Sequence, residues 1–126
     1  MDENEISKVI VDAAIEVHRT LGVPGLLESV YAEAETWELI KRGLCIEREK
    51  IIPIIYKGQT LGDPLRLDLL VDQKVIVECK ATVNYNTIFE AQILTYLRLT
   101  NLKLGIVINF GERLVKNGIH RVANGL

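Results

Sequence analysis

The chain has 126 residues and a formal net charge of −2, with 48% hydrophobic and 25% charged residues. These values predict one globular domain over residues 1–126 and exclude intrinsic disorder as its main state, because such a chain can bury a core. No apolar run approaches the roughly 18 residues that a membrane span needs. The acidic start, residues 1–5, is unlike the basic start of a signal peptide. We therefore expect a cytoplasmic protein.

The charge is unevenly distributed. Residues 1–40 contain nine acids and two bases, whereas residues 41–126 contain eight acids and thirteen bases. The net charge argues against a purely electrostatic nucleic-acid binder. The later bases predict either a basic face or ordinary solvated surface, and the charge alone favours the second.

The two cysteines lie in apolar segments and form no CxxC motif. We expect Cys45 and Cys79 to be inert core residues in a reducing compartment. The two histidines, His18 and His120, are scattered, so the spacing argues against a zinc site.

The first part of the chain predicts two helices. Apolar residues recur at helical spacing over residues 5–20, and the Gly22–Gly25 segment breaks that pattern. A second helix is expected from about Leu27 to Lys41. Gly43 follows it as the terminating glycine.

The pattern then changes to that of strands. Residues 45–56 are rich in β-branched side chains, and Pro53 within them indicates an edge strand or a bulge. Residues 65–71 and 75–81 predict two further strands, joined by a tight turn at residues 72–74.

A third helix is expected over residues 87–99, with Thr87 and Glu90 as a capping box. Residues 104–110 are fully apolar and fit a strand in the centre of a sheet. The tail, residues 114–126, is ambiguous. This order of elements predicts an α/β sandwich with a mixed sheet, in which the strand–helix–strand step is a right-handed crossover between parallel strands.

Two acids and a lysine are brought together by the expected hairpin. A turn centred on Gln73 places Asp68 five residues before the centre and Glu78 five residues after it, so the two carboxylates would face each other. Lys80 lies two residues beyond Glu78 and points to the same side. A slip of one residue in this register would separate them.

Facing carboxylates repel unless a cation lies between them, and hard oxygen ligands suit Mg²⁺ or Mn²⁺. A neighbouring lysine could activate a water or stabilise charge on a phosphate, so this set fits phosphodiester hydrolysis. The alternative is a surface salt bridge between Lys80 and one acid. Glu78 lies within an apolar strand, however, where a charged residue needs a reason.

Four further residues on the predicted helices are candidates for the functional site. Glu28 begins the second helix, where an acid also complements the helix dipole, and Tyr31 shares its face. Gln92 and Tyr96 lie on one face of the third helix. In isolation, a half-buried tyrosine with a surface glutamine is the simpler interpretation.

The segment Gly25-x-x-Glu28-x-x-Tyr31 resembles the signature of the GxxExxY proteins, a group within the PD-(D/E)XK nuclease superfamily. The resemblance implies a restriction-endonuclease-like αβββαβ core, with a mixed central sheet flanked by helices and an extra N-terminal helix. Other segments match in order along most of the chain. They are Val17-His18-Arg19, Arg66-Leu67-Asp68, Glu78-Cys79-Lys80-Ala81, Glu90-Ala91-Gln92 and Ile108-Asn109-Phe110.

The resemblance also implies roles for the site. Asp68 and Glu78 would hold Mg²⁺ or Mn²⁺, assisted by the Cys79 carbonyl or by Glu28. Lys80 would position or activate the attacking water. Glu28 resembles the additional acid that some branches carry on the first core helix.

Gln92 and Tyr96 are similar to a Gln-x-x-x-Tyr motif that contacts DNA in related exonucleases, and Tyr31 is a further candidate for substrate binding.

The sequence departs from the family pattern at two places. Leu67 replaces the proline that usually precedes the metal-binding aspartate, with Pro64 four residues before Asp68. The glycine segment, Leu-Gly-Val-Pro-Gly, is one residue longer than in many relatives.

These features together predict a metal-dependent nuclease acting on nucleic acid, first of all DNA, with no membrane association. The alternative is a non-catalytic nucleic-acid-binding or accessory domain that retains the nuclease fold. The apolar strands also allow a homodimer.

Overall fold

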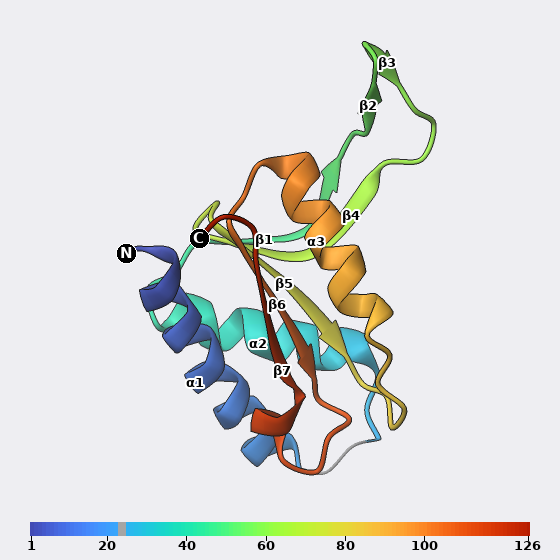
Figure 1. Cartoon of the computed structure of the whole chain (residues 1–126). Coiled ribbons are helices and arrows are strands. Elements are labelled where there is room, and N and C mark those ends of the chain that lie inside the picture. Colours follow the sequence, from blue (N-terminus) through green and yellow to red (C-terminus); the bar gives the residue numbers. More distant parts are fainter. Residues whose placement is uncertain (23–24) are drawn as a thin grey trace.

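A computed structural model describes residues 1–22 and 25–126 of the chain. Five strands form one sheet in the order β1-β4-β5-β6-β7, and β2 pairs with β3 in a separate small hairpin (Figure 1). β5 and β6 are parallel, and the other neighbours in the sheet are antiparallel. The predicted α/β class with a mixed sheet is therefore confirmed. The elements are α1 Glu3–Leu21, α2 Glu28–Lys41, β1 Ile46–Ile52, β2 Ile55–Tyr56, β3 Gln59–Thr60, β4 Leu65–Val71, β5 Val75–Lys80, α3 Ile88–Thr100, β6 Leu104–Asn109, η1 Val115–Gly118 and β7 Ile119–Ala123.

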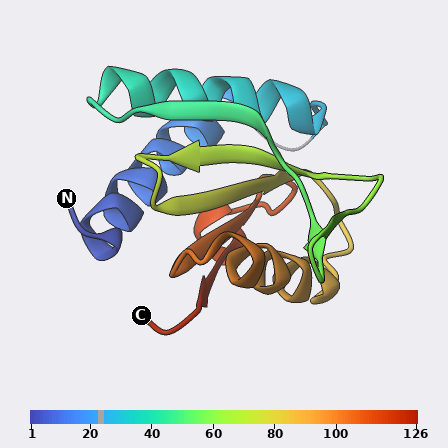
Figure 2. The same ribbon diagram turned by 90° about the horizontal axis from the view of Figure 1, so that it is seen from above.

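The helices cover both faces of the sheet. Figure 2 shows α1 and α2 on one side and α3 on the other. Side chains of β5 alternate between these layers: Val75, Val77 and Cys79 join the core beneath α1 and α2, whereas Ile76 joins the core beneath α3. Because both faces of β5 are covered, its residues read as a continuous apolar run interrupted by Glu78.

The end of α2 is set by Gly43, as the sequence predicts. Gly43 has a φ of 92°, a left-handed conformation that glycine adopts without a steric penalty. Its N–H donates to the Ile40 carbonyl at 2.9 Å, and the Leu44 N–H donates to the Leu39 carbonyl at 3.1 Å. This pair of bonds is a Schellman motif, and its two leucines are buried together in the core.

A capping box is present on α1 rather than on α3. Asp2 and Glu5 exchange hydrogen bonds between side chain and backbone at the start of α1. Thr87 precedes α3 as predicted, but within the described chain its side chain makes no capping hydrogen bond. Glu90 instead accepts a hydrogen bond from the Tyr85 hydroxyl at 3.1 Å. The predicted box at Thr87 is therefore wrong, because Glu90 binds the nearby Tyr85 and the Asn86 side chain accepts from the Ile88 N–H at 2.9 Å.

Pro53 ends the first strand. β1 lies at the edge of the sheet, as predicted, but it stops at Ile52 instead of continuing to residue 56. Proline has no N–H to donate to a neighbouring strand. Ile55 and Tyr56 pair with Gln59 and Thr60 in the β2–β3 hairpin instead.

The ambiguous tail forms a strand. After η1, β7 pairs antiparallel with β6 from Ile119↔Ile108 to Ala123↔Leu104. This pairing gives β6 a neighbour on each side, which makes it the interior strand that its apolar sequence indicates.

The two cysteines differ in their surroundings. Cys79 is fully buried, as predicted, whereas Cys45 is exposed, so the prediction of a core position for Cys45 is wrong. Cys45 lies in the connection between α2 and β1. Its N–H donates to Asp72 Oδ1 at 2.8 Å, and its carbonyl accepts from the Asp72 N–H at 2.8 Å.

α1 ends at Leu21 and is followed by Gly22 with a φ of 87°. The Val23-Pro24 part of the predicted helix break lies outside the described residues. In the two described ranges, none of the helices combines the length and apolarity required to cross a membrane.

Candidate active site

The β4–β5 hairpin has the register that the sequence predicts. Leu69 pairs with Val77, Leu70 with Ile76 and Val71 with Val75, so the turn is centred on Gln73. Asp72 and Gln73 both have left-handed backbones, with φ of 50° and 56°. This register places Asp68 and Glu78 at facing positions, one step beyond the last regular pair.

The regular ladder ends where the acids begin. Leu69↔Val77 is the last pair, and the Cys79 N–H donates to the Asp68 carboxylate, to Oδ2, at 2.9 Å. In a continued ladder, the Cys79 N–H would donate to a backbone carbonyl of β4. Here it donates to the Asp68 side chain instead. The two strands separate at this point, and Asp68 remains partly exposed.

Glu78 is buried beside Asp68. Its exposed fraction is 9%, and its Oε1 has no hydrogen-bond partner among the described residues. Burial first, and the neighbouring charge of Asp68 second, raise the pKa of Glu78 to about 9. A buried carboxylate oxygen without a donor is costly. A cation held by Asp68 and Glu78 would supply the missing partner and favour the ionised form of Glu78.

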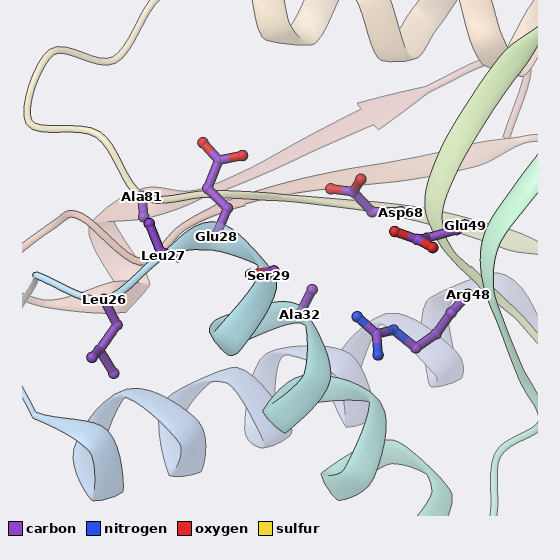
Figure 3. A pocket seen from close by; sticks show the side chains of 9 residues that line it. All are labelled: Leu26, Leu27, Glu28, Ser29, Ala32, Arg48, Glu49, Asp68 and Ala81. Carbon is purple, nitrogen blue, oxygen red and sulfur yellow. The ribbon is translucent and has the colours of Figure 1, made fainter.

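A pocket of about 560 Å³ opens beside Asp68. Figure 3 shows the Asp68 carboxylate pointing toward the end of α2 that carries Glu28. Glu28 is the first residue of α2 and is exposed, and it lines this pocket together with Asp68. The lining residues are Leu26, Leu27, Glu28, Ser29, Ala32, Arg48, Glu49, Asp68 and Ala81.

Glu49 is a pocket residue that sequence reasoning missed. It lies on β1 between the pairs Arg48↔Leu69 and Lys50↔Leu67, which places it opposite Asp68. Its φ is 49°, an uncommon value for a residue other than glycine, and all the more so within a strand. The sequence offers no signal for it, because charged residues are ordinary on an edge strand.

Lys80 contacts an aromatic ring rather than an acid. Its Nζ lies 4.5 Å from the centre of the Phe89 ring on α3. No ion pair of Lys80 occurs in the part of the chain that the structure describes, so the alternative of a surface salt bridge is wrong. The ammonium is held by a cation–π contact on the face of β5 that also carries Glu78.

The two residues predicted on α3 differ in exposure. Tyr96 is half-buried, and its pKa is raised by burial and then by the negative charges of Glu78 and Asp68. This influence places Tyr96 near the acid pair. Gln92, one turn earlier, is exposed to solvent and is available to a ligand.

Tyr31 lies in the core. Its ring is fully buried and stacks on Phe110, with centroids 4.8 Å apart and an interplanar angle of 4°. A ring without exposed surface offers nothing to a substrate, so the structure favours a packing role over the predicted binding role. One turn later, Glu35 is also fully buried, and burial raises its pKa well above the usual range. The Tyr31 hydroxyl and both Glu35 carboxylate oxygens have no hydrogen-bond partner within the described ranges.

Asn109 fastens the segment that follows Lys80. Its Oδ1 accepts from the N–H groups of Thr82 and Gly111, both at 3.0 Å, and its Nδ2 donates to the Thr82 carbonyl at 3.0 Å. The Phe110 N–H also donates to the Lys80 carbonyl at 2.7 Å. Asn109 belongs to one of the segments that resemble the family, but the resemblance assigned it no role. The structure shows that it orders the backbone around Lys80.

Replacing Asn109 by alanine is expected to destabilise the protein by about 2–4 kcal/mol, because the three hydrogen bonds of this buried side chain are lost. Denaturant unfolding monitored by circular dichroism measures this loss. Asn117→Ala, at an exposed position, is the matched control and should change stability by less than about 0.5 kcal/mol. Equal stability of the two variants would contradict the assigned role.

The acid pair fits a hard divalent cation. Across residues 1–22 and 25–126, no three His, Cys, Asp or Glu side chains are gathered closely enough to hold a metal ion by themselves. Mg²⁺ commonly uses only one or two carboxylates and keeps several waters. The unpartnered Glu78 Oε1 beside Asp68 meets that requirement.

Comparison with known proteins assigns the family. A solved structure described as "Crystal structure of SSO0001" is 16% identical, with coverage of 96% of this chain and 79% of that chain, at a TM-score of 0.47. A likeness at this score supports no argument. No curated protein matches the chain in sequence. The family model described as the PD-(D/E)XK nuclease superfamily matches residues 4–122, almost the whole chain. The chain belongs to the PD-(D/E)XK nuclease superfamily.

Proposed function

We propose that this protein is a metal-dependent nuclease that hydrolyses phosphodiester bonds in nucleic acid, with DNA as the first candidate substrate. The observation that supports it best is the buried, unpartnered Glu78 Oε1 beside Asp68, at the point where β4 and β5 separate. Membership of a nuclease superfamily supports the same reaction class. We also propose that the chain belongs to the GxxExxY group, on the basis of Gly25, Glu28 and Tyr31.

Each residue has a proposed role. Asp68 and Glu78, with the Cys79 carbonyl, would hold Mg²⁺ or Mn²⁺, which supplies charge stabilisation and a more acidic water when bound. Lys80 would orient the water and stabilise negative charge on the phosphate. Glu28 would add a carboxylate from the opposite wall of the pocket.

The substrate is proposed to lie between the pocket and α3. Gln92 is exposed and can donate to or accept from a nucleotide. Tyr96 lies near the acid pair, Asp68 and Glu78, and can position the nucleic-acid strand. Gln92 and Tyr96 would contribute to substrate binding more than to the rate of the chemical step.

Incubation with labelled single-stranded, duplex and branched DNA tests the activity. The wild-type protein is expected to cleave in Mg²⁺ or Mn²⁺ and not in EDTA, and Lys80→Ala is expected to lose the cleavage. Equal cleavage by both proteins would indicate a contaminant and contradict the assignment. Absence of cleavage by a folded wild-type protein on every substrate would contradict the proposed function.

A non-catalytic nucleic-acid-binding or accessory domain is the second candidate. It is favoured by the lack, among the described residues, of three acidic or other metal-ligating side chains gathered in one cluster. Binding of nucleic acid that is unchanged by EDTA, without cleavage, would support this candidate.

The proposed organisation is one domain located in the cytoplasm and able to form a homodimer. Both cysteines are free thiols, which suits a reducing compartment. Light scattering of the purified protein tests the dimer.

A further inference from the structure

The β2–β3 hairpin projects beyond the five-stranded sheet (Figure 1). Its turn, Lys57-Gly58, has φ of 49° and 81°, and these two left-handed residues are typical of a tight two-residue hairpin turn. The hairpin leaves most of its side chains in solvent. Tyr56 is 58% exposed and Ile55 is 55% exposed.

The chemistry of the hairpin suits nucleic acid. Between Pro53 and Gly62 the only charged residue is Lys57, so the segment contains no acid that would repel a phosphate. Lys57 Nζ lies 5.4 Å from the centre of the Tyr56 ring. An exposed aromatic ring beside a cation can stack on a base while the cation approaches the adjacent phosphate.

The hairpin rises from the same end of the sheet as the candidate site. β4 begins at Leu65, after a four-residue connection from the hairpin, and it is antiparallel to β5, which ends at Lys80. The first residue of β4 and the last residue of β5 therefore lie at one end of the sheet. Arg66 is exposed between the hairpin and Asp68, and it adds a second cation along this path.

We propose that the β2–β3 hairpin binds the substrate strand of the same site, with Tyr56 stacking on an unpaired base and Lys57 contacting the neighbouring phosphate. This inference rests on the proposed function, since it assigns the substrate class of that site as single-stranded or branched nucleic acid. Stacking requires a base whose face is open, which a continuous duplex does not offer.

Binding and cleavage are measured separately. Fluorescence anisotropy with a fluorescein-labelled single-stranded oligodeoxynucleotide, and with a blunt duplex of the same sequence, uses the full chain carrying Asp68→Asn, so that the probe stays intact. Tyr56→Ala in this background is expected to weaken single-strand binding about fivefold or more. Duplex binding should change by less than about twofold, because no base face is open there. Tyr56→Phe should retain both.

Lys57→Ala is expected to reduce the slope of log affinity against log salt by about 0.7, the effect of one lost phosphate contact on a single strand. The matched control is Lys103→Ala. Lys103 is exposed and precedes β6, at the opposite end of the sheet from Lys80. It should leave the affinity of the single strand unchanged.

The outcomes separate this inference from the proposed activity. Suppose that the wild-type protein cleaves and that Tyr56→Ala binds the single strand as tightly as the control Lys103→Ala. That result would overturn the hairpin inference and leave the nuclease proposal intact. Loss of binding in Tyr56→Ala without cleavage by any protein would support the hairpin inference and count against the activity. Equal weakening on single strand and duplex would overturn stacking on an unpaired base.

Discussion

Replacing Asp68 by asparagine is expected to lower the rate of metal-dependent cleavage by about 100- to 1,000-fold. Asparagine removes the negative charge that would hold the cation. It keeps a side-chain oxygen that can accept from the Cys79 N–H, the bond that Asp68 makes at 2.9 Å. The fold should therefore be preserved. Single-turnover cleavage in Mg²⁺, together with thermal unfolding, measures both effects.

The matched control for this prediction is Asp63→Asn. Asp63 is exposed in the connection that precedes β4, and the substitution removes the same charge from the surface. It should leave the rate within about twofold of the wild type, since an isolated surface charge contributes little. A rate for Asp68→Asn equal to that of the control would show that Asp68 takes no part in the reaction.

Glu78→Gln is expected to stabilise the metal-free protein at neutral and alkaline pH. The pKa of Glu78 is about 9 in the folded chain, raised by burial and by Asp68, against an ordinary value of 4.5. Between these values the folded state keeps a proton that the unfolded state releases. The stability that this proton provides is therefore present below about pH 4.5 and is lost as the pH rises through about 9. Glutamine cannot ionise and escapes this loss.

The size of the effect follows from the same comparison. Each pH unit above 4.5 costs the wild type about 1.4 kcal/mol, so the advantage of Glu78→Gln at pH 7 is on the order of 3 kcal/mol. Urea unfolding in EDTA at a series of pH values measures it. The difference should vanish near pH 4 and grow with pH. A constant difference over this range would contradict the assigned protonation.

Metal should reverse the order of stability. A bound cation favours the ionised carboxylate, so millimolar Mg²⁺ or Mn²⁺ is expected to stabilise the wild type and not Glu78→Gln. Glu35→Gln is the informative control. Glu35 is fully buried with a raised pKa, so its replacement should also stabilise the protein at neutral pH. Glu35 does not line the pocket, and its variant should keep the response to metal.

Local signals in the sequence were enough for the elements and for the central hairpin. Helical spacing predicted residues 5–20, and α1 covers Glu3–Leu21. A turn centred on Gln73 predicted the register of β4 and β5, because facing positions in a hairpin follow from the turn alone. That register brings Asp68 and Glu78 together. The superfamily was also accessible from the sequence, because its motifs are short segments that follow one another in order along the chain.

Contacts between distant segments decided the rest. Lys80 of β5 meets Phe89 of α3, and Tyr31 of α2 stacks on Phe110 after β6. Glu49 comes to face Asp68 only because β1 pairs with β4 across the intervening hairpin. The sequence by itself determined which residues share a strand or a helix face, because those relations depend on backbone period. Only the tertiary structure decided which faces are buried and which side chains meet, because burial and partners depend on how the elements pack.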